Sequence, residues 1–148
     1  MLIRLAAPLD LPGLASLVER YWAFESIGGF DRARIETLLS NLLAAPNRGA
    51  CWVAEADGRL CGYTLAVYLF SLEQGGLMAE IDELFVCPEA RCRGVGALLL
   101  AAAEQDFAQR GLIRLQLQIK VGNERARAFY ERHGFEPRAG YELFDKPV

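Results

Sequence analysis

The segment Arg91–Gly96 constrains the fold of this chain more than any other stretch. It reads Arg-Cys-Arg-Gly-Val-Gly, and it lies between an apolar strand that ends at Val86 and a helix expected from about Val95 to Arg110. The first amide groups of a helix have no partner inside the helix, and the helix dipole makes this end positive. The two glycines let the backbone approach a ligand closely, and both arginines add positive charge. The segment therefore predicts a binding site for a diphosphate, with an ordinary glycine-rich turn before a helix as the alternative.

The strands before this loop exclude two common diphosphate-binding folds. A dinucleotide-binding fold requires a parallel βαβ unit and a third glycine, whereas this sequence has Leu99 at that position and connects its strands as hairpins. A P-loop requires Gly-Lys-Ser/Thr, which does not follow here. The hairpin elements are Cys51–Ala56, the Asp57-Gly58 turn, Leu60–Phe70, the Gly75-Gly76 turn and Leu77–Val86.

The rest of the chain alternates short strands with helices. Hydrophobic spacing and capping residues predict a strand over Met1–Ala6, a helix from Asp10 to Glu19, a helix from Asp31 to Pro46, a strand over Leu112–Lys120, a helix from Asn123 to Gly134 and a final strand over Phe135–Phe144. Across a two-residue turn at Asp57-Gly58, Cys51 faces Thr64 and Cys61 faces Ala54. The order βααβββαβαβ indicates an α+β fold in a single domain over residues 1–148.

Composition narrows the classes of function. The chain is 53% hydrophobic and 24% charged, as expected of a packed globular protein. Its net charge of −3 argues against nucleic-acid binding, which requires clustered cations. Four cysteines without a CxxC pair and a single histidine give no basis for a metal site. Without a signal peptide or a long apolar run, we expect a cytoplasmic protein that does not contact membranes.

Two motifs resemble those of the GNAT acetyltransferase superfamily. The first is Arg91-x-x-Gly94-x-Gly96 after a strand that ends Leu84-Phe85-Val86, and the second is the stretch from Asn123 to Phe135, similar to Asn-x-x-Ala-x-x-Phe-Tyr-x-x-x-Gly-Phe. The resemblance covers nearly the whole chain. It implies a central, mostly antiparallel twisted sheet with helices on both faces, and a splay between the fourth and fifth strands.

The resemblance also implies a site for acetyl-CoA as co-substrate, without a metal. The pantetheine amide is expected to pair, like an added strand, with exposed backbone near Phe85 and Val86. The residues that the resemblance assigns to acetyl-CoA are Leu84, Phe85, Val86, Arg91, Cys92, Arg93, Gly94, Val95, Gly96, Asn123, Ala126 and Phe129. Position 92 is commonly glycine in this loop. A positive φ at Cys92 would strain the loop and lower cofactor affinity, whereas without a positive φ the cysteine is harmless, which is the outcome we expect.

Transfer of acetyl to an amine requires groups that move protons. Glu80, Asp82 and Glu83 lie in the strand before the loop, and simple alternation places Glu80 and Asp82 on one face with Glu83 on the other. The resemblance permits any of these carboxylates as the base, with Asp82 and then Glu80 as first choices. It assigns to Tyr130 the protonation of the departing thiolate.

The acceptor side of the site is less specific. The resemblance places the first two helices and their connection along the acceptor wall, where Tyr21, Trp22, Glu25 and Phe30 would suit a small cationic amine. Packing of the aromatic residues in the core, with surface-exposed acids, is the alternative. We therefore expect an N-acetyltransferase for a primary amine, with protein N-terminal or lysine acetylation and a non-catalytic acyl-CoA sensor as alternatives. A homodimer is compatible with the resemblance.

Overall fold

The computed structural model describes residues 1–148, which group into two compact units, Met1–Gln118 and Ile119–Val148. The expectation of one domain stays a prediction. The elements are β1 (Leu2–Leu5), η1 (Pro8–Asp10), α1 (Leu11–Glu25), α2 (Arg32–Leu43), β2 (Gly49–Ala56), β3 (Arg59–Ser71), β4 (Gly76–Val86), η2 (Pro88–Ala90), α3 (Val95–Gln109), β5 (Arg114–Leu117) and α4 (Glu124–Arg132). None of the helices has the length and apolar character needed to cross a membrane.

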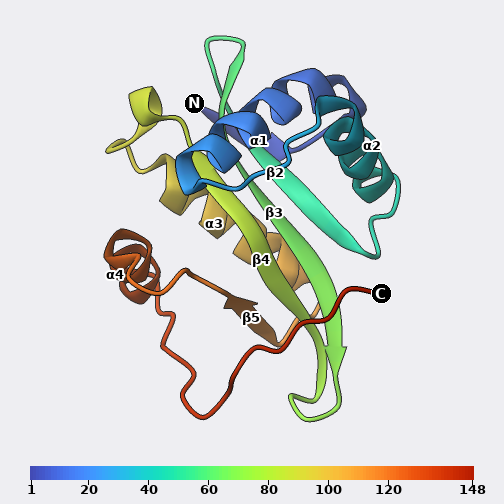
Figure 1. Ribbon diagram of the computed structural model, residues 1–148, viewed down its shortest axis with the longest axis vertical. Helices are drawn as coiled ribbons and strands as arrows, with labels where there is room; N and C mark the ends of the chain where they lie inside the picture. The colour runs from blue at the N-terminus through green and yellow to red at the C-terminus, as the bar shows by residue number, and fades with distance from the viewer. The chain divides into compact units, whose positions relative to one another are not determined.

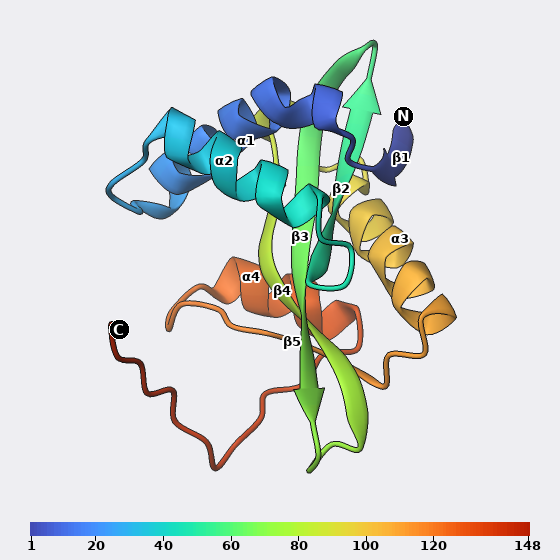
Figure 2. The same cartoon turned by 90° about the vertical axis from the view of Figure 1, so that its right-hand side faces the viewer.

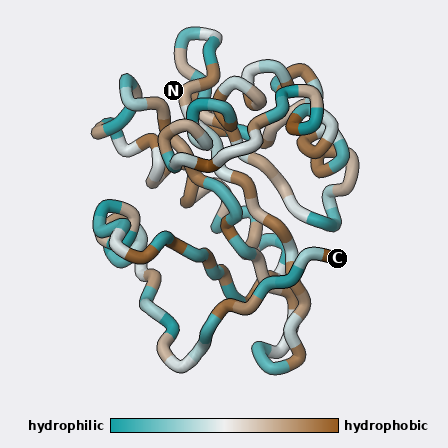
Figure 3. Tube along the Cα trace, in the orientation of Figure 1, coloured by the Kyte–Doolittle hydropathy of each residue, from teal (hydrophilic) through white to brown (hydrophobic).

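The first unit is a three-layer arrangement around a five-stranded sheet of order β1-β2-β3-β4-β5 (Figure 1). All neighbours are antiparallel except β4 and β5, which are parallel. Helices α1 and α2 pack on one face and α3 on the other, each over its own apolar cluster (Figure 2). The Asp57–Arg59 turn is hydrophilic, in contrast to the apolar strands that it joins (Figure 3). The predicted α+β class, the mostly antiparallel sheet and the helices on both faces are confirmed.

Helix α1 extends six residues beyond the predicted end at Glu19. Its buried face, with Leu14, Leu17 and Val18, continues because no helix breaker precedes Ser26, which ends the helix in a left-handed conformation with φ 57°. The predicted cap at its start is wrong in detail, because the Asp10 carboxylate makes no cap bond to the helix and instead binds Arg4. The extension places the aromatic residues after Glu19 on a rigid helix instead of a loop.

Two β-bulges shift the pairing of the long strands. Between β2 and β3, Ala54 pairs with Gly62 and Glu55 with Leu60, so Cys61 is an extra residue. Cys51 consequently faces Leu65 instead of the expected Thr64. A bulge inserts one residue into one strand and reverses the facing of every side chain beyond it.

The second bulge lies in β4, at the middle of the sheet. Leu65 pairs with Glu83 and Ala66 with Ile81, so Asp82 is the extra residue. The pairing of β4 with β5 ends just before this bulge, because it runs only from Met78 to Ile81 of β4. Residues 83–86 of β4 therefore pair with β3 alone, which confirms the predicted splay between the fourth and fifth strands.

The second unit contains one helix, α4, and a C-terminal stretch without strands. The predicted cap is present, because the Asn123 side chain accepts a bond from the Ala126 amide at 3.1 Å. The predicted final strand over Phe135–Phe144 is wrong: these residues form no ladder. Pro137 has no amide hydrogen to donate, and Gly140 has a φ of 85°, so both interrupt an extended run.

Candidate functional site

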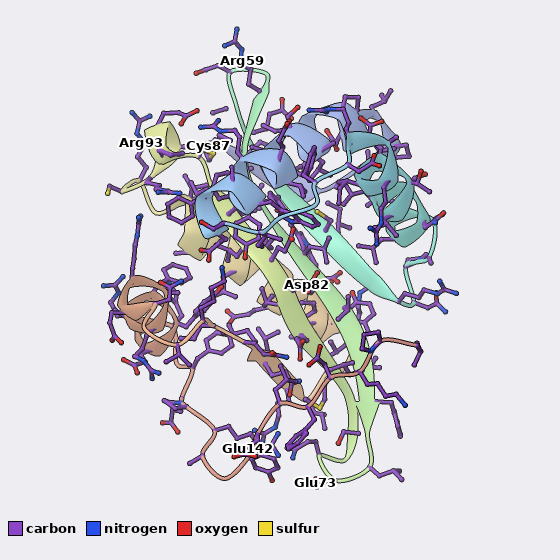
Figure 4. All side chains as sticks on the ribbon, viewed as in Figure 1. Arg59, Glu73, Asp82, Cys87, Arg93 and Glu142 are labelled. Carbon is purple, nitrogen blue, oxygen red and sulfur yellow. The ribbon has the colours of Figure 1, made fainter.

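The loop before α3 has the backbone shape expected of an anion site. Cys92 and Gly94 both have positive φ, 61° and 74°, and no side chain caps the start of α3 at Gly94. Successive amides in such a turn point to one side, and the first-turn amides of α3, beginning at Val95, have no acceptor within the helix. Arg93 is exposed beside them and forms no ion pair within its unit (Figure 4). The loop therefore presents amide hydrogens and one exposed cation on the same side, a geometry that suits an anion.

The expectation for Cys92 was wrong, because this residue has left-handed backbone conformation. In that conformation the Cβ of an L-residue approaches the following carbonyl oxygen, at a cost of roughly 1–2 kcal/mol. Glycine avoids this contact, which explains why glycine suits this position.

We predict that Cys92→Gly raises the free energy of unfolding by up to about 1 kcal/mol. Relief of the left-handed strain exceeds the roughly 0.4–1 kcal/mol that glycine adds to the entropy of the unfolded chain. Urea unfolding measures the change, with Cys92→Ala as the control that removes the thiol but keeps Cβ. Equal midpoints for the glycine and alanine variants would contradict the strained conformation.

The end of β4 offers an open backbone edge. The Cys87 amide donates to the Cys61 carbonyl at 2.9 Å, and Val86 lies opposite Gly62. Because successive residues of an antiparallel strand direct their backbone groups to opposite sides, Val86 directs its amide and carbonyl away from β3, into the splay. The exposed backbone expected near Phe85 and Val86 is therefore that of Val86, whereas Phe85 is buried in the core under α1.

The bulge at Asp82 overturns the predicted facing of the acids. Leu65 and Val67 contribute to the cluster under α1 and α2, and they pair with Glu83 and Glu80. Glu80 and Glu83 therefore share the face covered by these helices. Simple alternation had assigned them to opposite faces, and it failed because the extra residue between them adds one step.

Glu83 is held by two donors from the neighbouring elements. The Tyr63 hydroxyl donates to one carboxylate oxygen at 2.6 Å, and the Trp22 indole nitrogen donates to the other at 2.9 Å. Burial raises the pKa of Glu83, and the two hydrogen bonds oppose part of that rise. Burial also raises the pKa of Tyr63, so its hydroxyl remains a donor. Glu83 thus ties α1 to the middle of the sheet.

Asp82 differs from both glutamates. Glu80 accepts bonds from Gln116 at 2.6 Å and from Gln118 at 3.4 Å. Asp82 accepts no hydrogen bond within its unit and reaches the surface midway along β4 (Figure 4). Its pKa is raised, chiefly by the protein around its carboxyl group and then by the charge of Glu80. Among the three acids, Asp82 has the carboxylate that is available to a substrate.

We predict that Glu83→Gln becomes more stable relative to the wild type as the pH rises. A carboxyl group whose folded pKa is raised stabilises the fold fully below its ordinary pKa of 4.5 and loses that contribution as the pH passes the folded value. Glutamine does not titrate, so the difference in unfolding free energy between variant and wild type grows across this window. Urea titrations at several pH values measure it, and a constant difference would contradict the raised pKa.

The predicted acceptor residues lie on α1 and on the connection to α2. Trp22 and Phe30 meet edge to face with ring centroids 6.0 Å apart, and Tyr21 lies 5.8 Å from Phe85. All three predicted aromatic residues are half-buried against the core cluster, and Glu25 is half-buried as well. The aromatic residues therefore combine packing with partial exposure.

Tyr130 belongs to the second unit and lies on α4. Its ring contacts Phe129 and Phe135, with centroids 5.1 and 5.4 Å away. Burial raises the pKa of Tyr130 to about 12, so the phenol is protonated at neutral pH. The Phe135 amide donates to the Tyr130 carbonyl at 3.1 Å, which closes the end of the helix.

Sequence reasoning missed two side chains and one contact that support the site. Tyr63 holds Glu83, Arg20 binds both carboxylate oxygens of Glu89 at 2.9 Å, and Phe24 lies against the Arg91 guanidinium. Tyr63 had no signal, because pairing outward from the predicted Gly75-Gly76 turn places it opposite Pro88, beyond the acidic strand. Neither contact of α1 had a signal, since the helix was expected to end at Glu19.

Comparison with known proteins identifies the family. The family model described as "Acetyltransferase (GNAT) family" matches residues 14–135. An uncharacterised N-acetyltransferase of Bacillus subtilis is 32% identical over 148 residues, which covers 95% of this chain and 93% of that protein. An aminoalkylphosphonate N-acetyltransferase of Salmonella typhimurium is 31% identical over 84 residues, 57% of this chain and 54% of that protein.

Solved structures agree with the sequence comparison. The crystal structure of a probable acetyltransferase superposes with a TM-score of 0.88 at 25% identity, covering all of this chain and 98% of that one. The match of the family model over most of the chain and the full-length relative point to the same assignment. The chain belongs to the GNAT family and is an N-acetyltransferase.

Proposed function

We propose that this enzyme transfers acetyl from acetyl-CoA to the primary amine of a small cationic acceptor, by direct attack of the amine on the thioester. The observation that carries this proposal is the state of Asp82. It lies in the bulge where β5 leaves β4, its pKa is raised, and its carboxylate accepts no hydrogen bond within its unit. A general base must reach the proton that it takes and have a pKa closer to the working pH than a free carboxylate, and a carboxylate without other donors is available for this.

The first unit fits acetyl-CoA at two places. Val86 directs its amide into the splay, where it can donate to the pantetheine arm as an edge strand donates to an added strand, while its carbonyl on the same edge accepts from Arg91. The turn through Cys92 and Gly94 and the amides at the start of α3 offer donors to the diphosphate. The open edge lies at the end of β4, and the loop follows it after η2. One molecule of acetyl-CoA could therefore place its pantetheine arm on the edge and its diphosphate at the loop.

The chemistry requires three proton transfers. Asp82 takes a proton from the acceptor ammonium, directly or through water, and the neutral amine then attacks the thioester carbonyl carbon. The carbon–sulfur bond of the resulting tetrahedral intermediate breaks, and the electron pair leaves on sulfur. Tyr130 keeps the role that the family resemblance implies, donation of its phenolic proton to the thiolate. The nitrogen, which carries a positive charge after the attack, loses its proton to the tyrosinate as the neutral amide forms, so Tyr130 is regenerated and Asp82 releases its proton to water.

The residues on α1 support a cationic acceptor with an apolar body. Trp22 and Phe30 offer ring faces and edges, and Glu80, Asp82 and Glu83 bring negative charge to the adjoining strand. The Salmonella relative, named for an aminoalkylphosphonate acceptor, shows that a small amine is compatible with related sequences. Asn123, Ala126 and Phe129 keep their expected place among the cofactor-binding residues as part of this proposal.

An acceptor panel tests the function. Calorimetry with acetyl-CoA comes first, followed by thiol release with diamines, aminoalkylphosphonates, aminoglycosides and peptides with free N-termini or lysines. We expect turnover with small amines. Turnover confined to peptides would favour protein acetylation, binding without turnover on any acceptor would favour a sensor, and failure to bind acetyl-CoA would exclude both functions. Sedimentation equilibrium tests the proposed homodimer separately.

A further inference from the structure

The side chain of Arg91 folds back from the loop onto the end of β4. Its Nε donates to the Val86 carbonyl at 2.8 Å, and its guanidinium carbon lies 4.6 Å from the centroid of Phe24 and 5.7 Å from that of Phe85. The guanidinium is thus placed between the strand end and two aromatic rings. This placement differs from the role expected of Arg91, which was to add charge at the diphosphate.

The Val86 carbonyl is the last acceptor on the open edge of β4. It points away from β3, on the side that β5 has left, and there an extended ligand would add its own hydrogen bonds. Arg91 donates to this carbonyl and so occupies the last acceptor of the edge. Immediately after it, the chain turns into η2 and the loop. The position of Arg91 therefore bears on how the edge receives the pantetheine arm.

Phe24 lies near the C-terminal end of α1, with its ring toward Arg91 and Phe85. Its side chain is 55% exposed, and its contacts are with Arg91 and, at 6.5 Å between centroids, with Phe85. One helical turn earlier, Arg20 binds Glu89 through both carboxylate oxygens, and this ion pair lowers the pKa of Glu89 to about 2. Residues one turn apart on α1 thus contact both ends of the segment 89–91, just before the loop.

We propose that Phe24 is a positioning residue for the acyl-CoA site. Together with Phe85 it holds the Arg91 guanidinium at the Val86 carbonyl, which preorganises the open edge for the pantetheine arm. Arg93, exposed and without an ion pair in its unit, is then the cation of the loop that meets the diphosphate. This inference rests on the proposed function, because it assigns parts of the same acetyl-CoA site.

Two ligands separate the roles of the arginines. Coenzyme A carries both the pantetheine arm and the diphosphate, whereas pantetheine lacks the diphosphate. Phe24→Leu removes the ring face that attracts the guanidinium, a contact that corresponds to about a two- to fivefold change in affinity at an exposed site. We expect this variant to raise the Kd of both ligands by the same factor, and we expect Phe24→Tyr, which keeps the ring face, to restore wild-type values.

Arg93→Ala is the matched variant for the loop. It should raise the Kd of coenzyme A and leave the Kd of pantetheine unchanged, with a weaker dependence of coenzyme A binding on salt than in the wild type. The assignment is overturned if Phe24→Leu affects coenzyme A alone, leaves both ligands unchanged, or tightens pantetheine. The first result would place Arg91 at the diphosphate, and the last would mean that Arg91 obstructs the edge.

A measurement without ligand distinguishes failure of this inference from failure of the proposed function. The Arg91 Nε–H resonance, assigned by its loss in Arg91→Lys, should be protected from exchange and shifted by the ring current of Phe24, and both effects should diminish in Phe24→Leu. If the wild type does not bind coenzyme A, the proposed function fails and this inference with it. If it binds while the resonance does not respond to Phe24→Leu, only the role of Phe24 is refuted.

Discussion

Asp82→Asn should lower kcat/KM for amine acetylation by roughly 10²- to 10³-fold, within the range that general-base catalysis contributes. The carboxylate must be ionised to accept a proton, so the wild-type rate should fall as the pH decreases through the pKa of Asp82, which is raised above its ordinary 3.8. Asparagine cannot titrate, and the variant should lose this acidic limb. A pH–rate profile from thiol release, at saturating acetyl-CoA, measures both effects.

Glu80→Gln is the matched control on the same strand. The charge of Glu80 helps to raise the pKa of Asp82, and its neutral replacement should move the acidic limb of the profile to lower pH. The rate on the plateau should change little, because Glu80 already accepts bonds from Gln116 and Gln118. Turnover of Asp82→Asn within threefold of the wild type, with its acidic limb intact, would refute Asp82 as the base.

The sequence predicts the order of elements up to α4 but neither the absence of a final strand nor the arrangement of the acids. Alternation, glycine turns and helix caps depend on local interactions, which is why the hairpins and the caps at Asp31 and Asn123 are confirmed, whereas the confirmed splay followed from the family resemblance. A bulge depends on how two strands fit the layers above and below them. Neither Cys61 nor Asp82 differs locally from an ordinary strand residue, so the facing of Glu83 could not be predicted.

The predictions for the end of α1 and for the conformation of Cys92 failed for different reasons. Residues 20–25 have no breaker, and their helical state is favoured by packing of Tyr21 on Tyr63 and Phe85, which lie far away in the sequence. Cys92 adopts a positive φ because the turn into α3 requires it, whatever residue stands there. In both cases tertiary context overrides local preference, and the affected residues lie at the site.

The side chains that support the site thus come from α1, the helix whose length the sequence analysis underestimated. Trp22 on α1 donates to Glu83, Arg20 binds Glu89, and Phe24 contacts Arg91. Glu83 and Glu89 lie on either side of the open edge of β4, so one helix fixes both the acidic segment and the start of the loop. In the proposed function, α1 therefore contacts both the acceptor side of the site and the loop proposed to bind acetyl-CoA.

Tyr130→Phe should lower kcat by roughly 10²- to 10³-fold and leave the Kd of acetyl-CoA within about twofold of the wild type. Burial raises the pKa of Tyr130 to about 12, so the phenol carries its proton across the neutral range and can donate it to a thiolate. Phenylalanine keeps the ring contacts with Phe129 and Phe135, so folding of the helix should be preserved. Calorimetry gives the Kd, and single-turnover thiol release gives the rate of the chemical step.

Tyr141→Phe provides the control within the same unit. Tyr141 is exposed, and its ring lies 4.0 Å from the guanidinium of Arg138, a contact that phenylalanine keeps in part. We expect its kcat to match the wild type. The loss in Tyr130→Phe should persist at every pH between 6 and about 9, because the wild-type phenol remains protonated throughout this range. Unchanged turnover of Tyr130→Phe across these pH values would exclude Tyr130 as the acid and require water to protonate the thiolate.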